Sequence, residues 1–152
     1  MPHIRPAALA DQPAVQSITV QTIRAVYPHY YPEGAVEFFL AHHNDARIAA
    51  DIAAGIVHLL TDGDIPVGTV TLRGNEICRL FVLPEHQGKG YGRALLEFAE
   101  STILAQHPQI VLDASLPAKA IYLKRRYIPC EFHTIDTPNG DKLCYDIMIR
   151  KG

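Results

Sequence analysis

The sequence predicts a mixed α/β (α+β) fold in which helices flank a central β-sheet. Segments with apolar residues at helical spacing alternate with short runs rich in β-branched residues, in the order β-α-α-β-β-β-α-β-α-β-β. This order corresponds to a sheet of about six to seven strands and about four helices. Three strands follow one another through short turns in mid-chain and two more do so at the end, so both groups are expected to pair as antiparallel strands.

The first third of the chain is expected to be helical after one short strand. Residues 3–6 suit that strand. Asp11, two residues ahead of a proline, suits a helix start, because a carboxylate and a proline both favour the first turn. The helix covers residues 15–27, and a loop rich in Tyr and Pro follows it. Residues 36–54 then predict helix, in one piece or in two joined near the adjacent histidines, ending at Gly55.

The middle of the chain predicts three strands and one helix. Residues 56–62, 66–74 and 74–84 are rich in β-branched residues and are separated by turn signals, which favours a meander. The segment that follows Gly92 places its leucines on one side, as in an amphipathic helix, with Glu100 on the opposite side.

The last third predicts a strand, a short helix and a final hairpin. Residues 110–114 form a short apolar strand, and residues 117–127 predict a helix that begins at a proline and has arginines near its end, where cations suit the helix dipole. Residues 130–136 and 143–150 predict the two strands of the hairpin, with Asn-Gly at 139–140 as the turn signal.

Length and composition fit a single domain spanning residues 1–152. A chain of this size buries roughly 70% of the surface that its unfolded form exposes, so it needs no disulfide or metal to fold. The formal net charge is −2 without a basic stripe, which disfavours nucleic acid as a partner. The chain has 3 cysteines and no CxxC spacing, which predicts neither a disulfide framework nor a metal site and suggests a cytoplasmic location. No apolar run reaches the roughly 20 residues of a membrane span, and no signal peptide is apparent.

The stretch QGKGYG at residues 87–92 is the most informative local pattern. It follows the apolar run LFVLP and precedes a helix. The first amides of a helix have no intrahelical partner and lie at the positive end of its dipole. Gly88, Gly90 and Gly92 carry no side chain that would keep a pyrophosphate away from those amides, and Lys89 and Arg93 can add positive charge at the rim. A tight strand-to-helix turn without a ligand is the alternative.

Two familiar phosphate-binding motifs do not fit this stretch. A Walker A loop ends in Gly-Lys followed by Ser or Thr, whereas here Lys89 precedes Gly90 and no hydroxyl residue follows. A dinucleotide-binding loop lies inside a parallel βαβ unit, whereas this loop follows an expected antiparallel meander.

The same stretch resembles motif A of the GNAT superfamily, the GCN5-related N-acetyltransferases. That motif reads Q/R-x-x-G-x-G/A and is matched by Gln87, Gly90 and Gly92. Residues 118–127 resemble a later family element, A-x-x-x-Y-x-x-x-G-F, through Ala118, Tyr122 and Tyr127. Two positions depart from the family pattern: Arg126 stands where Gly is common, and Ser115 stands where Asn is common.

The resemblance implies a GNAT fold, with acetyl-CoA as co-substrate, no metal, and direct transfer of the acetyl group to a primary amine in a ternary complex. An alternative is a catalytically silent CoA-binding sensor or interaction module, for which the departures at Ser115 and Arg126 leave room. Transfer of a longer acyl group is also open. The residues implied in CoA binding are Leu80, Phe81, Val82, Gln87, Gly88, Lys89, Gly90, Tyr91, Gly92, Arg93 and Ser115.

Amide formation needs a base for the amine and an acid for the leaving sulfur. An alkyl amine has a pKa of about 10 and is mostly protonated at pH 7. Glu76 is the base candidate, directly or through water, because simple alternation places it on the same face of its strand as Cys78, Leu80 and Val82, and because its position resembles that of the base in several GNAT enzymes. Tyr122 resembles the family's general acid. Val82 resembles the residue whose backbone receives the pantetheine arm.

The acceptor side is expected near the first helices and their loop, which wall the acceptor pocket in the family. Candidate contacts in this region are Tyr27, His29, Tyr30, Tyr31, His42 and His43, and Cys78 is expected to be a wall residue rather than a nucleophile. No feature of the sequence names the acceptor, so a small amine, an amino acid, a peptide N-terminus and a lysine all stay open. The C-terminal hairpin offers an edge on which a homodimer is conceivable.

Overall fold

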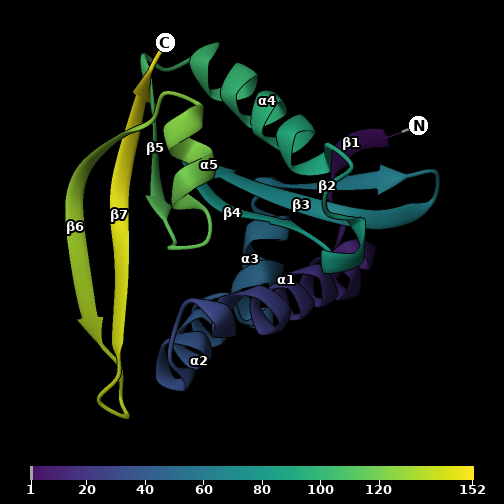
Figure 1. The fold of residues 1–152 in the computed structure, drawn as a ribbon. Helices are drawn as coiled ribbons and strands as arrows, with labels where there is room; N and C mark the ends of the chain where they lie inside the picture. The colour runs from purple at the N-terminus through teal and green to yellow at the C-terminus, as the bar shows by residue number, and fades with distance from the viewer. Residues whose placement is uncertain (1) are drawn as a thin grey trace.

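The structure of the chain is a computed structural model that describes residues 2–152. Seven strands form one sheet in the order β1-β2-β3-β4-β5-β7-β6 (Figure 1). Neighbouring strands are antiparallel except β4 and β5, which are parallel. The strands are β1 (Pro2–Pro6), β2 (Val57–Asp62), β3 (Ile65–Arg73), β4 (Glu76–Val82), β5 (Gln109–Ala114), β6 (Ile128–Asp136) and β7 (Lys142–Lys151). The predicted mixed sheet, its central meander and its final hairpin are confirmed.

The helices cover both faces of this sheet. They are α1 (Gln12–Val26), α2 (Glu33–His42), α3 (Asp45–Ala53), α4 (Tyr91–Leu104) and α5 (Lys119–Lys124), with short 3-10 turns at η1 (Leu9–Asp11), η2 (Tyr27–His29) and η3 (Pro84–His86). The predicted helix over residues 36–54 is split in two. The Asn44 side chain accepts a hydrogen bond from the Arg47 amide at 2.9 Å and so starts α3 as its N-cap.

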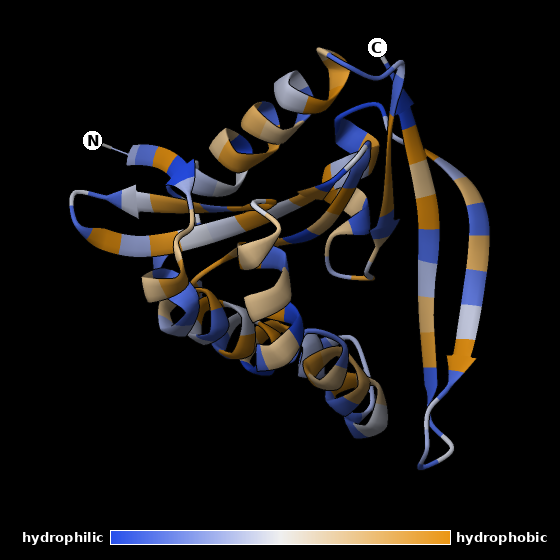
Figure 2. Cartoon of the chain, turned by 180° about the vertical axis from the view of Figure 1, so that it is seen from behind, coloured by the Kyte–Doolittle hydropathy of each residue, from blue (hydrophilic) through white to orange (hydrophobic). Residues whose placement is uncertain are grey.

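The core consists of two apolar clusters, one on each face of the sheet. Leu95, Leu96 and Ile103 of α4 pack on one face against β3, β4 and β5. Val15 and Ile18 of α1 pack on the other face together with residues of α2 and α3. Figure 2 shows both hydrophobic and hydrophilic bands along β7, and Leu143, Asp146 and Met148 of this strand are buried. The sheet is therefore the middle layer of a three-layer molecule.

The parallel pair β4–β5 is short, and this opens the sheet near its centre. Only Glu76↔Val111 and Ile77↔Leu112 are in register, although β4 continues to Val82. Beyond Ile77 the edge of β4 that faces β5 has no strand neighbour. In Figure 1, β5, β6 and β7 turn away from β2–β4, and α5 lies near the opening.

A β-bulge in β4 corrects the predicted facing of its side chains. Thr71 pairs with Arg79 and Leu72 pairs with Ile77, so Cys78 is an extra residue without a partner in β3. Simple alternation placed Glu76 on the face of Leu80 and Val82, and this was wrong. Ile77 packs in the cluster beside α4, and Glu76 lies on the opposite face with its register partner Arg73.

Glu100 was expected on the outer side of its helix, and this was also wrong. Its side chain is buried, with the whole residue 5% exposed. The carboxylate accepts hydrogen bonds from Arg125 Nε at 3.1 Å and Tyr127 Oη at 3.0 Å, and it forms an ion pair with Arg150 at 2.8 Å. These partners are distant in sequence, so helical spacing carried no information about them.

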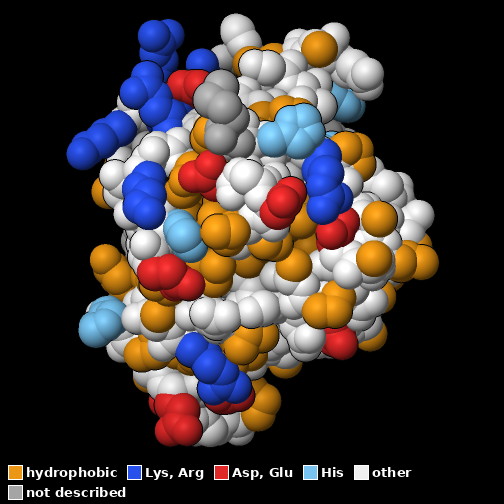
Figure 3. All heavy atoms as spheres, turned by 90° about the vertical axis from the view of Figure 1, so that its right-hand side faces the viewer, with side chains coloured by type: hydrophobic (Ala, Val, Ile, Leu, Met, Phe, Trp, Pro, Cys, Tyr) orange, Lys and Arg blue, Asp and Glu red, His pale blue; other side chains and the backbone are white. Residues whose placement is uncertain are grey.

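The surface carries both signs of charge. On the face shown in Figure 3, basic side chains gather at one upper corner, and acidic, basic and histidine side chains are interspersed elsewhere. Within residues 2–152 no helix is both long enough and apolar enough to cross a bilayer.

Candidate active site

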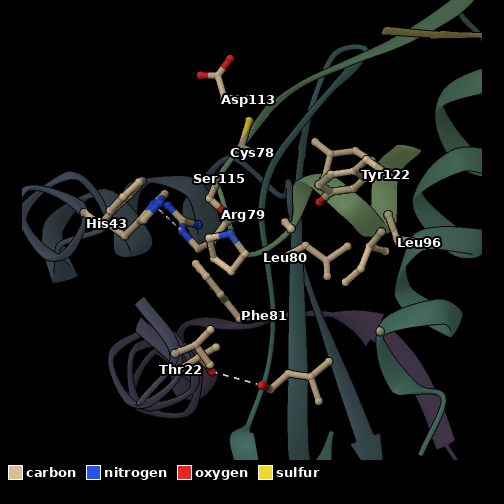
Figure 4. A pocket seen from close by; sticks show the side chains of 18 of the residues that line it. Thr22, His43, Cys78, Arg79, Leu80, Phe81, Leu96, Asp113, Ser115 and Tyr122 are labelled. Carbon is tan, nitrogen blue, oxygen red and sulfur yellow. Dashed lines mark hydrogen bonds between the residues drawn. The ribbon is translucent and has the colours of Figure 1, made fainter. Parts of the chain in front are cut away.

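One large cavity occupies the opening of the sheet. Its volume is about 1020 Å³, and it is lined by residues of α1–α3, β4, the glycine loop, α4, α5 and the β5–β7 half of the sheet. This is at the upper end of the range for small-molecule sites, about 300–1,000 Å³. Figure 4 shows that its side chains form two groups: His43 and Arg79 lie on one side of Leu80, and Tyr122 and Leu96 lie on the other.

The glycine loop ends at the first turn of α4, beside the cavity. Gly88 and Gly90 have φ angles of 80° and 86°, which residues with a Cβ rarely adopt. Gly90 is the N-cap of α4, and a Cβ built on either glycine meets no atom within 4 Å. No side chain of this loop therefore fills the space beside the first turn of α4, and the residues present fit a bound pyrophosphate. The positive φ angles add a second reason for glycine that the sequence did not reveal.

The end of β4 is held by two side chains that donate to one carbonyl. Thr22 Oγ1 and Gln87 Nε2 donate to the Val82 carbonyl at 3.2 and 3.0 Å. That carbonyl thus points away from β3, and in a strand the N–H and C=O of one residue point to the same side. Gln87, predicted to bind the cofactor, ties the glycine loop to β4, and the Val82 amide is directed into the opening.

The other residues predicted to bind CoA differ in their surroundings. Tyr91 is buried and its hydroxyl donates to Asp62, so its backbone rather than its ring faces the cavity end of the loop. Arg93 pairs with Glu97 at 3.0 Å on the outside of α4. Leu80, Phe81, Gly92, Arg93 and Ser115 line the cavity, whereas Lys89 does not. The Ser115 carbonyl, not its hydroxyl, accepts from the amides at the start of α5.

Glu76 lies at the beginning of β4 on the wall formed by α2 and α3. Burial is the main cause that raises the pKa of its carboxyl above 4.5, and the nearby Asp113 carboxylate adds to this. Cys78 follows in the bulge. Burial and the Glu76 carboxylate raise the pKa of the Cys78 thiol to about 11, so this sulfur is a thiol and a poor nucleophile at neutral pH.

Tyr122 lines the cavity from α5, on the other side of β4. Its ring packs against Tyr127 with centroids 5.3 Å apart. Burial is the main cause that raises the pKa of its phenol above the ordinary value of 10.0. The phenol therefore keeps its proton at any ordinary pH and is a donor. It and Glu76 reach one cavity from opposite sides of the strand.

A buried ionic network, which the sequence did not predict, forms the floor of the α2–α3 side. Arg79 is 5% exposed and donates to Thr71 Oγ1 at 2.8 Å and to Asp51 Oδ2 at 3.0 Å. Arg73 reaches the other Asp51 oxygen at 2.7 Å. His43 accepts from Arg79 Nε at 3.4 Å. Only the fold brings these residues together, because they lie just after α2 and on α3, β3 and β4.

The predicted acceptor contacts are only partly brought together. Tyr27, His42, His43 and Cys78 line the cavity. Tyr30 is 52% exposed and lies outside the lining. Tyr31 is buried elsewhere: its hydroxyl accepts from the Leu116 amide at 2.8 Å and donates to the Cys144 carbonyl at 2.9 Å, so it fastens the α1–α2 loop to the other half of the sheet.

The mixed sheet that opens between β4 and β5 and the glycine loop at the N-terminus of α4 border one cavity. Residues 26–136 match the acetyltransferase (GNAT) domain, and the chain belongs to this family. A comparison with curated proteins gives no match. Among residues 2–152 no group of three His, Cys, Asp or Glu side chains is placed to hold a metal ion.

Solved structures share the fold over the whole chain. A GCN5-related N-acetyltransferase from Rhodopseudomonas palustris is similar at a TM-score of 0.90 and 26% identity, covering 100% of this chain and 96% of that one. PaiA N-acetyltransferase from Thermoplasma acidophilum, solved with coenzyme A, gives 0.76 at 18% identity, covering 100% and 99%. Arabidopsis thaliana Naa50, solved with the bisubstrate analogue CoA-Ac-MVNAL, gives 0.70 at 21%, covering 99% of each chain.

Proposed function

We propose that residues 1–152 form one N-acetyltransferase domain that moves an acetyl group from acetyl-CoA to a primary amine by direct transfer in a ternary complex. The observation that carries this proposal is the opening between β4 and β5, which joins the glycine loop, Glu76 and Tyr122 in a single cavity. Acetyl-CoA supplies the activated acetyl group when it is bound.

The chain offers two kinds of contact to CoA. The α4 amides behind Gly88 and Gly90 suit the pyrophosphate, because the helix dipole and the absence of side chains act together. The free edge of β4, ending at Val82, offers backbone groups to the pantetheine arm. Solved relatives of the same fold contain coenzyme A or a CoA analogue, which supports this assignment.

Glu76 and Tyr122 divide the proton transfers between them. Glu76 takes the proton of the attacking amine, and its raised pKa makes its carboxylate a stronger base. Tyr122 stays protonated because of burial and gives its proton to the leaving sulfur. Cys78, a thiol beside Glu76, forms part of the wall and no covalent intermediate.

The experiment measures thiol release from acetyl-CoA with a panel of amines. We expect Tyr122→Phe to lower kcat by about 100-fold or more, the usual contribution of a positioned acid or base. We expect Glu76→Gln to lower kcat/KM by a similar factor. In the wild type, kcat/KM falls as the pH drops through the Glu76 pKa, which lies above 4.5 because of burial. Glu76→Gln removes this acidic limb.

Tyr30→Phe and Glu37→Gln are matched controls. Both residues are exposed and lie outside the cavity, so both variants keep wild-type rates. Wild-type turnover in Tyr122→Phe and Glu76→Gln would remove both assigned roles. Tight CoA binding without turnover of any amine would identify a silent CoA-binding module instead. If titration with CoA gives no heat, the protein does not bind CoA, and the glycine loop is only a tight strand-to-helix turn.

A further inference from the structure

We infer that Tyr31 is a positioning residue for acyl transfer: its hydroxyl is inserted between β5 and β7 and thereby sets the width of the opening between β4 and β5. The inference rests on the proposed function, because this opening is the place assigned to the pantetheine arm and the acyl group. Tyr31 itself lies outside the cavity lining, so it acts through the residues that it holds.

The register of β5 and β7 shows which contact Tyr31 replaces. The two strands pair in one unbroken register up to the end of β5 at Ala114. Continued by two residues, this register sets Leu116 opposite Cys144. The Gly152 amide donates to the Pro108 carbonyl at 3.1 Å at the other end, and hydrogen-bonded pairs alternate from there. Leu116 and Cys144 are therefore a pair in which the amide of the first would donate directly to the carbonyl of the second.

The Tyr31 hydroxyl occupies this place instead. It accepts a hydrogen bond from the Leu116 amide at 2.8 Å and donates one to the Cys144 carbonyl at 2.9 Å. A single hydroxyl oxygen can do both. The inserted oxygen thus keeps apart two backbone groups that would otherwise bond to each other, and the pairing of β5 with β7 ends at Ala114.

The ring of Tyr31 is held from the α1–α2 side of the molecule. Tyr31 is buried, and its ring centroid lies 5.8 Å from that of Tyr27 and 5.1 Å from that of Phe39. Three residues further on, the Gly34 amide donates to Asp141 Oδ2 in the β6–β7 turn at 2.8 Å. Both contacts join the start of α2 and the loop before it to the β5–β7 half of the sheet, so the position of that half depends on this segment.

The residues next to the inserted hydroxyl form the far edge of the opening. Ser115 lines the cavity, and its carbonyl accepts from the Ala118 and Lys119 amides at 3.1 and 3.0 Å, so it holds the start of α5, the helix of Tyr122. Strand pairing does not fix the width of the opening here, because β4 and β5 share only two register pairs at their other end. The contacts of Tyr31 therefore do so.

Tyr31→Phe is expected to widen the opening. Without the hydroxyl, the Leu116 amide can donate directly to the Cys144 carbonyl, which moves Ser115 and α5 toward β7 and away from β4. The test measures thiol release from acetyl-, propionyl- and butyryl-CoA with one amine. We expect the ratio of kcat/KM for acetyl-CoA to that for butyryl-CoA to fall about fivefold, the contribution of one hydrogen bond. This ratio does not depend on how much of the protein is folded, so a loss of stability alone leaves it unchanged.

Tyr30→Phe is the matched control, because it makes the same change one residue away on an exposed ring outside the cavity. It should keep the wild-type ratio. Asp141→Ala is a second variant that removes the contact to Gly34 and leaves Tyr31 in place. We expect it to lower the ratio in the same direction by a smaller factor, and it decides the question if Tyr31→Phe does not fold in circular dichroism melts.

The outcomes separate this inference from the proposed function. An unchanged ratio in Tyr31→Phe, or an equal loss with all three acyl-CoAs, overturns the inference and leaves acetyl transfer standing. If the wild type uses no acyl-CoA, the proposed function fails, and calorimetry with CoA and ADP decides the inference, because ADP carries a pyrophosphate without a pantetheine arm. Weaker binding of CoA with unchanged binding of ADP in Tyr31→Phe supports it. Unchanged binding of CoA, an equal loss for both ligands, or no binding of CoA overturns it.

Discussion

At the scale of single residues, Arg126 adopts a backbone conformation that residues with a Cβ disfavour. Its φ angle is +71°, and among the described residues every other positive φ belongs to glycine. Arg126 follows the C-cap of α5, the position where helices commonly end on a left-handed glycine. The Tyr127 amide then returns to the Tyr122 carbonyl at 3.1 Å. Arg126 thus replaces the glycine that is common in the family, and the backbone still makes the left-handed turn after α5.

Arg126→Gly is expected to stabilise the protein. A left-handed conformation costs a residue with a Cβ roughly 1–2 kcal/mol, and glycine avoids this cost. Glycine also makes the unfolded chain more flexible, which offsets part of the gain in stability. We expect the free energy of unfolding to rise by about 0.5–1 kcal/mol in urea denaturation. Arg126→Ala keeps the Cβ and serves as the control without this gain. Equal stability of the two variants would show that the φ angle carries no cost here.

At the scale of elements, the glycine loop and α4 form a unit whose shape depends on Gly90. This residue is the N-cap of α4 at φ +86° and lines the cavity. Sequence reasoning assigned its missing Cβ to the approach of a ligand. The structure adds a conformational requirement, so a substitution has two separable effects, one on stability and one on binding.

Gly90→Ala is expected to weaken both folding and CoA binding. The strained φ angle lowers the free energy of unfolding by about 1 kcal/mol, and the new methyl group faces the space assigned to the pyrophosphate. We expect the Kd for CoA, measured by calorimetry, to rise about tenfold.

Gly55→Ala separates the two effects. Gly55 follows α3 at φ +76°, also with no atom within 4 Å of an added Cβ, and lies outside the cavity. It should lose similar stability and keep the wild-type Kd. A normal Kd in Gly90→Ala would contradict the placement of the pyrophosphate.

At the scale of the whole molecule, Glu100 joins three elements that meet only in the tertiary structure. It projects from α4 and holds Arg125 and Tyr127, which follow α5, and Arg150 of β7. Burial by itself raises the pKa of Glu100, but the hydrogen bonds from Arg125 and Tyr127 outweigh it and lower the pKa below 4.5. The carboxylate thus helps to position α5, and with it Tyr122, against the rest of the sheet.

Glu100→Gln is expected to destabilise the protein by about 2 kcal/mol, because it leaves the half-buried guanidinium groups of Arg125 and Arg150 without their buried charge partner. Since the folded pKa is lowered, the contribution of Glu100 is present above about pH 4.5 and is lost as the pH falls through the folded value. The difference in unfolding free energy between wild type and variant should therefore shrink in urea titrations as the pH is lowered from 4.5.

Glu97→Gln, on the same helix, is the control for this experiment. Its partner Arg93 is exposed, and such surface pairs contribute about 0.2–1 kcal/mol. A difference between wild type and Glu100→Gln that stays constant with pH would show that the ionised form has no stabilising role.

Local patterns in the sequence were enough to predict the order of helices and strands and the glycine loop before α4, because these depend on periodicity and on spacing along the chain. Three features were decided only by the tertiary structure. The bulge at Cys78 set the face of Glu76, because one extra residue reverses the alternation of a strand. The burial of Glu100 and the Arg73–Asp51–Arg79 network depend on residues that are far apart in the chain. Local sequence patterns do not show which distant residues come into contact.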